Sequence, residues 1–209
     1  MSTLLYIKAS PRGPRSHSIA VAEAFLEAYF ALHPDDKLIT KNLFSENLPP
    51  FDGDVLQAKY NVMHGVDHSP QEAKAWEDVK RYVKELKSCD KLVMAVPMWN
   101  YALPYRLKQY IDIIVQPGLT FGYDSEKGYF TLVPDKPTFI AYASGGEYPA
   151  GSQAQTLDYQ KPYLEMILGF IGLKDIRSVR VEATLMGPET AKARREQATA
   201  RALAMVKDF

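Results

Sequence analysis

The hydrophobic positions of this chain form two alternating patterns. Short, nearly continuous apolar runs are typical of strands buried on both faces, and they alternate with segments whose apolar residues recur every three or four positions, as in helices with one buried side. The predicted strands cover residues 4–9, 37–43, 91–96, 138–143 and 176–181. The predicted helices cover residues 18–32, 55–63, 69–88, 104–115, 159–169 and 188–207.

This alternation predicts an α/β fold in which a five-stranded parallel sheet is covered by helices on both faces. We expect a single domain over residues 1–209, with an aromatic, hairpin-like insertion at about residues 118–133. In one of the two common strand orders, 2-1-3-4-5, the ligand crevice opens between strands 1 and 3 at the carboxyl edge of the sheet. A ligand is then expected on the loops that follow strands 1, 3 and 4.

The loop after the first strand has the features of a phosphate site. It runs from Ser10 through Ser16-His17-Ser18 and leads directly into a helix. Free backbone N–H groups and the positive end of the helix dipole meet at such a junction. The hydroxyls of Ser10, Ser16 and Ser18 would add donors, and we expect His17 to contact the ligand. The alternative is an ordinary turn with capping residues.

The other two loops carry residues suited to a planar ring. The loop after the third strand contains Met98-Trp99-Asn100-Tyr101, in which two aromatic side chains flank an amide. The loop after the fourth strand contains Ser144-Gly145-Gly146, where the glycines allow the backbone to approach a ligand closely. Each loop alone could be a plain turn, but three such loops at one sheet edge favour a heteroaromatic ligand that carries a phosphate.

Composition and missing motifs exclude several functions. The chain has 25 basic and 25 acidic residues, so no net charge attracts nucleic acid or an anionic membrane. It lacks the nucleotide-triphosphate P-loop, the Gly-x-Gly-x-x-Gly dinucleotide motif and the Gly-x-Ser-x-Gly esterase elbow. No apolar run is long enough to span a bilayer, and we expect a cytoplasmic protein.

His64 and His68 have a spacing that could bind a metal on a helix, but the glycine between them argues against it, and we predict no metal site.

With these three loops, the chain resembles the FMN-dependent NAD(P)H azoreductases, which belong to the flavodoxin-like quinone reductases. The resemblance covers nearly the whole chain, and the loop Pro97-Met98-Trp99-Asn100-Tyr101 is its most specific part. The other matching segments are Ser10-Pro11-Arg12, Ser16-His17-Ser18, Leu103-Pro104, Leu107-Lys108, Asp112, 118–123, Gly145-Gly146 and 168–172. Two positions depart from many relatives, because Ser144 stands where Arg is common and Trp99 stands where Tyr is common.

The resemblance implies non-covalent FMN, with NADH or NADPH as the electron donor. Quinones, azo compounds or nitroaromatics would be reduced by two-electron, ping-pong hydride transfer through the flavin, which needs no catalytic side chain. The implied FMN contacts are Ser10, Ser16, His17, Ser18, Met98, Trp99, Asn100, Tyr101, Ser144, Gly145 and Gly146.

The family also implies a homodimer with active sites at the interface. In such a dimer, one copy would supply a wall over the flavin of the other copy, formed by Phe121, Tyr123, Tyr129, Phe130 and Phe170. Ordinary packing within the hairpin is the alternative explanation for these residues. Two other functions stay open at this stage: a flavodoxin-type electron carrier, and an FMN-dependent regulatory binding protein. Carriers are usually shorter and strongly acidic, whereas this chain is neutral and has extra loops. Only an enzyme would oxidise NAD(P)H with a quinone unaided.

Overall fold

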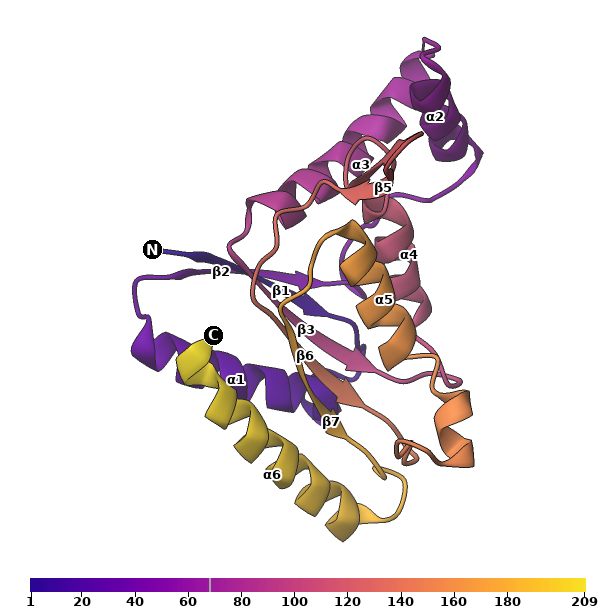
Figure 1. Cartoon of the computed structure of the whole chain (residues 1–209). Helices are drawn as coiled ribbons and strands as arrows, with labels where there is room; N and C mark the ends of the chain where they lie inside the picture. Colours follow the sequence, from indigo (N-terminus) through magenta and orange to yellow (C-terminus); the bar gives the residue numbers. More distant parts are fainter. Residues whose placement is uncertain (68) are drawn as a thin grey trace.

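A computed structural model describes residues 1–67 and 69–209 of the chain. Its main element is a parallel five-stranded sheet in the order β2-β1-β3-β6-β7, which confirms the predicted 2-1-3-4-5 order (Figure 1). The strands are β1 (Thr3–Lys8), β2 (Lys37–Asn42), β3 (Lys91–Pro97), β6 (Thr138–Ala143) and β7 (Ile176–Val181). Two further strands, β4 (Phe121–Asp124) and β5 (Gly128–Thr131), form an antiparallel hairpin.

Helices cover both faces of the sheet, as the continuous apolar runs of the central strands require. They are α1 (His17–Leu32), α2 (Gly53–His64), α3 (Pro70–Ser88), α4 (Tyr105–Ile114), α5 (Lys161–Ile171) and α6 (Pro188–Met205). Helices α1 and α6 lie on one face, and α3, α4 and α5 lie on the other (Figure 1). Every residue of β6 is buried, whereas the edge strand β2 is mostly exposed.

Local sequence signals explain most helix ends. Ser69 and Glu72 form a capping box at the start of α3, in which each side chain accepts from the other residue's backbone N–H. The predicted helices 104–115 and 188–207 are each shorter, since α4 begins at Tyr105 and α6 ends at Met205. Three short 3₁₀ turns that the sequence did not predict lie at η1 (Gly13–Arg15), η2 (Gln153–Leu157) and η3 (Val206–Asp208).

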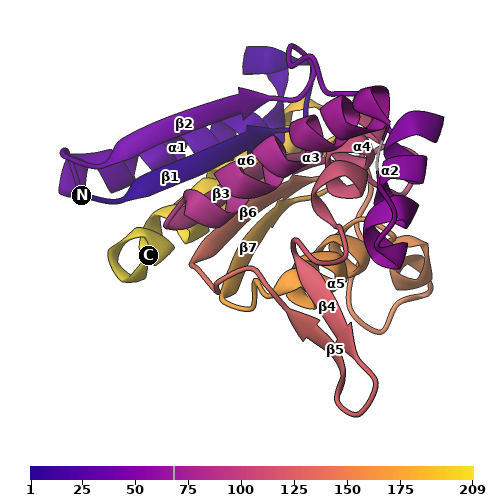
Figure 2. The same ribbon diagram turned by 90° about the horizontal axis from the view of Figure 1, so that it is seen from above.

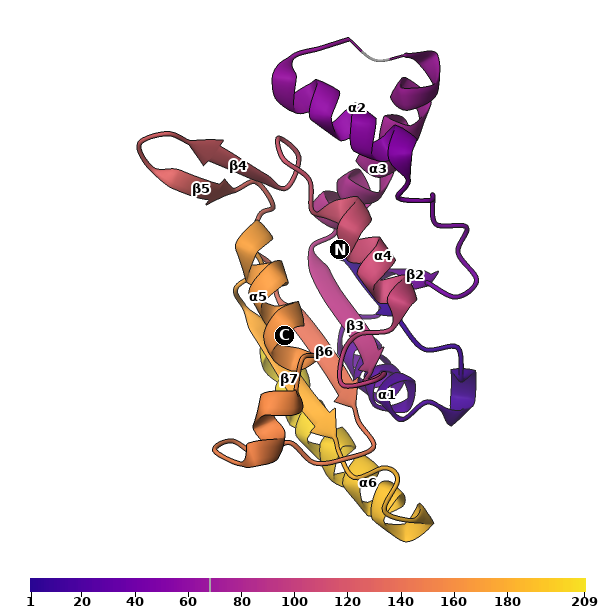
Figure 3. The same cartoon turned by 90° about the vertical axis from the view of Figure 1, so that its right-hand side faces the viewer.

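The direction of the helices fixes which loops meet. Helices α4 and α5 run back from the carboxyl edge of the sheet, and the β4–β5 hairpin lies beyond their far ends (Figure 3). Seen from above, the hairpin projects from the body of the molecule (Figure 2). The loops after β1, β3, β6 and β7 lie instead at the carboxyl edge. Within the described residues, no helix is both long and apolar enough to cross a membrane.

Candidate functional site

The loop after β1 ends in a capped helix start. Ser16 is the N-cap of α1, and its Oγ accepts a hydrogen bond from the backbone N–H of Ile19 at 3.5 Å. Ser16 Oγ and Ser18 Oγ lie 3.1 Å apart, and Ser10 Oγ accepts from the N–H of Arg12 at 3.4 Å. All three serines are buried. The N–H groups of His17 and Ser18, which precede Ile19 in the first helical turn, have no acceptor in the described part of the chain, so they remain available to an anion.

His17 has an unsatisfied atom at this helix start. Its Nδ1 is buried and finds no hydrogen-bond partner among the described residues. Burial lowers the pKa of the imidazole below its usual value, and the charges of Arg195 and Arg12 lower it further. A buried ring nitrogen without a partner costs free energy unless a ligand supplies the bond.

The loop after β3 is a tight turn in a strained conformation. Trp99 and Ala102 exchange two backbone hydrogen bonds of 2.9 Å across the turn. The central residues, Asn100 and Tyr101, both have positive φ, at 46° and 67°. This is the pattern of a type I′ turn, which Asn tolerates but which is unusual for Tyr. The N–H of Tyr159 donates to the carbonyl of Tyr101 at 2.9 Å and braces the turn.

The loop after β6 is held by the loop after β7. The backbone N–H groups of Ala183, Thr184 and Leu185 donate to the carbonyls of Gly146, Ser144 and Gly145 at 3.1, 3.2 and 3.3 Å. A Cβ atom on Gly145 would lie 2.6 Å from Leu185 Cδ1, so the glycine permits this close approach. The N–H groups of Gly145 and Gly146 themselves have no protein acceptor within the described part of the chain.

These loops enclose two neighbouring clefts. One, of about 450 Å³, is lined by Met98, Asn100, Tyr101, Gly145, Gly146, Tyr148, Leu185 and Met186. The other, of about 420 Å³, is lined by His17, Thr184, Leu185, Gly187, Pro188, Ala191, Lys192 and Arg195. Both clefts share Leu185. The structure therefore brings five of the predicted contact residues to the first cleft and His17 to the second.

The remaining predicted contacts are placed differently. Ser10, Ser16 and Ser18 are buried within the loop after β1, and Ser144 Oγ donates to the carbonyl of Gly146 at 2.9 Å, which shapes the glycine loop. Trp99 does not line either cleft: its ring packs against Phe44 and Tyr105, with centroids 5.5 and 6.2 Å away.

The residues present fit the FMN that the sequence resemblance implies. FMN needs donors for a phosphate at one end and donors for ring carbonyls at the other. The unpartnered Nδ1 of His17 lies at the helix start, and the free N–H groups of Gly145 and Gly146 lie beside the other cleft. The protein therefore offers polar groups without a partner of their own to both ends of FMN.

The predicted aromatic wall forms one cluster, but away from these loops. The ring centroids of Phe121 and Tyr129 lie 4.8 and 5.6 Å from that of Phe170. The ring centroids of Tyr123 and Tyr129 lie 5.1 Å apart. Phe130 packs over Gly122, where a Cβ would meet its ring at 2.2 Å. The cluster joins the hairpin to the far end of α5, beyond the amino edge of the sheet (Figure 3). These residues therefore cannot cover the clefts of their own chain.

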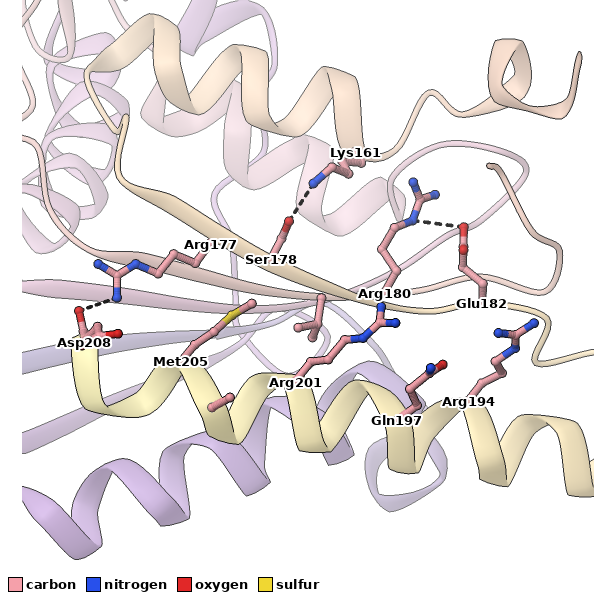
Figure 4. A pocket seen from close by; sticks show the side chains of 12 residues that line it. Lys161, Arg177, Ser178, Arg180, Glu182, Arg194, Gln197, Arg201, Met205 and Asp208 are labelled. Carbon is pink, nitrogen blue, oxygen red and sulfur yellow. Dashed lines mark hydrogen bonds and ion pairs between the residues drawn. The ribbon is translucent and has the colours of Figure 1, made fainter. Parts of the chain in front are cut away.

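A larger cavity, of about 880 Å³, lies elsewhere, along the open edge of β7 between α5 and α6 (Figure 4). Its cationic side chains are mostly matched by carboxylates. Arg180 pairs with Asp158 at 2.9 Å and with Glu182 at 3.1 Å, and Arg177 pairs with Asp175 at 3.3 Å. The cavity shares no residue with the two clefts at the carboxyl edge, and its size alone does not make it the functional site.

Sequence reasoning missed the loop after β7 and one face of α6. Leu185 and Met186 are 84% and 66% exposed, and an apolar pair between a strand and the Pro188 helix start was a signal in the sequence. Arg195, on the last helix of the chain, was not among the predicted contacts, but it lines the cleft that contains His17. Within residues 1–67 and 69–209, no three or more His, Cys, Asp or Glu side chains are grouped so that they could hold a metal ion. Of the two histidines considered as metal ligands in the sequence, His64 and His68, the second lies outside the described residues.

Comparisons with known proteins agree with this fold. A family model described as a flavodoxin-like fold matches residues 2–206. The chain is 52% identical, over the full length of both proteins, to an FMN-dependent NADH:quinone oxidoreductase of Nitratidesulfovibrio vulgaris (strain DP4). It is similar in structure to an azoreductase from Bacillus anthracis str. Sterne, with a TM-score of 0.91, 29% identity and full coverage of both chains. An FMN-dependent NADH-azoreductase from Bacillus anthracis str. Ames Ancestor, solved in complex with FMN, matches with a TM-score of 0.86 at 27% identity, covering 99% of this chain and 100% of the other.

Proposed function

The chain belongs to the flavodoxin-like family of FMN-dependent NADH:quinone oxidoreductases and azoreductases, and from this premise we propose how its own residues serve that activity. It is an enzyme that binds FMN at the carboxyl edge of its sheet, oxidises NADH and reduces quinones or azo compounds. The observation that carries the proposal is the pair of clefts whose polar groups, His17 Nδ1 and the Gly145 and Gly146 amides, have no protein partner in the described chain.

The loop after β1 would hold the FMN phosphate. The helix dipole and the free N–H groups at the start of α1 favour a dianion there, and the buried serine hydroxyls add polar contacts. His17 Nδ1 gains a partner when the phosphate is present. The loop therefore orients the cofactor by its phosphate end.

The ring end would lie between the loops after β3 and β6. The strained turn presents Asn100 and Tyr101, and the Gly145 and Gly146 amides, which have no protein acceptor in the described chain, would donate to the pyrimidine edge of the ring. Bound FMN supplies the two-electron hydride chemistry. The preorganised amides stabilise negative charge where it develops on the cofactor, which is the electrostatic contribution of the protein.

We further propose a homodimer in which the hairpin cluster of one copy covers the clefts of the other. The hairpin side chains Tyr123, Tyr129 and Phe130 are 66%, 66% and 48% exposed, and their own chain offers them no cleft to cover. Exposed aromatic clusters of this kind mark interaction surfaces. A cytoplasmic location stays a prediction from the sequence.

Steady-state turnover tests the activity. Under anaerobic conditions, purified protein reconstituted with FMN should oxidise NADH catalytically, beyond one equivalent per flavin, only when a benzoquinone is present, and removal of the flavin should abolish the rate, which added FMN restores. An electron carrier would instead need a second reductase. The activity is wrong if the FMN-loaded protein oxidises NADH no faster than the same concentration of free FMN.

A further inference from the structure

Helix α6 brings positive charge to the start of α1. Arg195 is half-buried and lines the same cleft of about 420 Å³ as His17, together with the exposed Lys192 one helical turn before it. The buried Ala198 and Ala202 pack this helix into the core on the face of the sheet that it shares with α1. The position of Arg195 is therefore set by the fold and not by a flexible loop.

The neighbouring arginine faces another way. Arg194 lines the cavity along β7 (Figure 4). Its side chain pairs with Glu147. Arg195, by contrast, takes part in none of the ion pairs formed within residues 1–67 and 69–209. Successive helical residues point about 100° apart, so one arginine serves the β7 edge and the next serves the cleft at His17.

The charges that face His17 are all of one sign. Arg12 comes from the loop after β1, and Lys192 and Arg195 come from α6, while the loop after β7 contributes the uncharged Thr184 and Leu185. Like charges gathered around a buried, unpartnered ring nitrogen raise the free energy of the protein alone. A bound dianion adds an attraction to each of these groups, which offsets their mutual repulsion.

We propose that Arg195 is a phosphate-binding residue of the FMN site, which extends that site from the loop after β1 to the C-terminal helix. A phosphate monoester carries about −1.5 to −2 charges at pH 7, so it gains from the guanidinium as well as from the backbone N–H groups. Arg195 thereby favours FMN over riboflavin, which has the same ring but no phosphate. This inference rests on the proposed function.

The test compares the two flavins on matched variants. The affinity of apo-protein for FMN and for riboflavin is measured by quenching of flavin fluorescence. Arg195→Gln should weaken FMN binding about tenfold and leave riboflavin binding unchanged, because a charge-assisted contact to phosphate is lost. Arg195→Lys should recover part of the FMN affinity. Arg194→Gln, on the neighbouring position, should leave both affinities unchanged.

A second readout is the titration of His17 followed by NMR. Its pKa in the apo-protein lies below the usual 6.5, and Arg195→Gln should raise it, because one of the cations that lower it is removed. FMN should raise it in the wild type, since phosphate stabilises the protonated ring. Riboflavin should leave it unchanged.

The outcomes separate this inference from the function. Equal losses for FMN and riboflavin in Arg195→Gln would show a structural role and overturn the proposal, as would no loss for either. If wild-type protein turns over NADH and quinone in either of those cases, the function stands and only the role of Arg195 fails. If the wild type binds neither flavin, the proposed function fails as well.

Discussion

Gly172 shows how a single residue attaches the hairpin to the body of the molecule. It ends α5 with φ at 126°, a conformation that L side chains rarely adopt. A Cβ atom there would lie 2.3 Å from the carbonyl oxygen of Val133, two residues after the end of β5. Backbone cannot move aside as a flexible side chain can, so this position requires glycine.

Replacing Gly172 should therefore destabilise the protein. We expect Gly172→Ala to lower the free energy of unfolding by about 2–4 kcal/mol, measured by urea denaturation, because it combines backbone strain with a clash. Gly169→Ala is the matched control: it lies within α5, where a Cβ would meet nothing within 4 Å. That change should be neutral or stabilising by up to about 1 kcal/mol. Equal effects of the two substitutions would contradict the role given to Gly172.

Individual residues were predictable where local rules fix them. Ser69 and Glu72 form a capping box, a pattern that spans only four positions of sequence. The glycine pair at 145–146 indicates a place where backbone can approach closely. The direction of a side chain on an irregular loop follows no such rule, so the packing of Trp99 on Phe44 could not be foreseen. Arg195 is similar, because its neighbour His17 is 178 positions away in sequence.

At the scale of elements, the hairpin packs against the end of α5, away from the loops after β1, β3, β6 and β7 that form the candidate site. The hairpin aromatics contact Phe170 near the end of α5, and α5 itself starts beside the strained turn after β3, where Tyr159 braces Tyr101. One helix thus links the wall cluster and the loops, but it holds them at its opposite ends. A wall over the flavin consequently needs a second copy of the chain.

Tyr123→Ala tests that arrangement. The variant should raise the KM for quinone while the affinity for FMN stays nearly unchanged, because Tyr123 lies far from the loops of its own chain. Steady-state kinetics and fluorescence quenching measure the two quantities. Equal losses of both would instead indicate a folding role for the hairpin.

Mixing two variants makes the same test independent of any single defect. His17→Glu places a negative charge at the phosphate loop and should abolish FMN binding while leaving the hairpin intact. Refolded together with Tyr123→Ala, it should recover about one quarter of wild-type activity at low quinone concentration, since half of the dimers are mixed and each has one intact site. Activity equal to the mean of the two parents would contradict shared sites.

The elements were predicted from sequence better than their exact ends. All five sheet strands and all six helices coincide with predicted segments, because periodicity reports burial directly. The strand order 2-1-3-4-5 was chosen from the two common orders of this architecture and not read from the sequence, since pairing between distant strands leaves no local pattern. The 3₁₀ turns at Gly13–Arg15 and Gln153–Leu157 were missed, because short turns of this kind have no periodicity to detect.

On the scale of the whole molecule, the doubly wound topology explains why the functional groups meet. Parallel strands bring the loops after β1, β3, β6 and β7 to one edge, and the order of the sheet opens a crevice beside β1 and β3. The same topology sends the hairpin to the opposite edge (Figure 3). A cofactor site and an exposed aromatic cluster at opposite ends follow directly from this winding.

Anaerobic reduction of the bound cofactor tests the central claim most directly. FMN-reconstituted protein is titrated with NADH while the visible absorption of the flavin is recorded, and a quinone is then added. We predict that NADH bleaches the bound flavin in proportion to the FMN present and that the quinone restores the absorption. Bound FMN that NADH leaves unbleached would contradict the enzyme, and protein that retains no FMN would contradict the site itself.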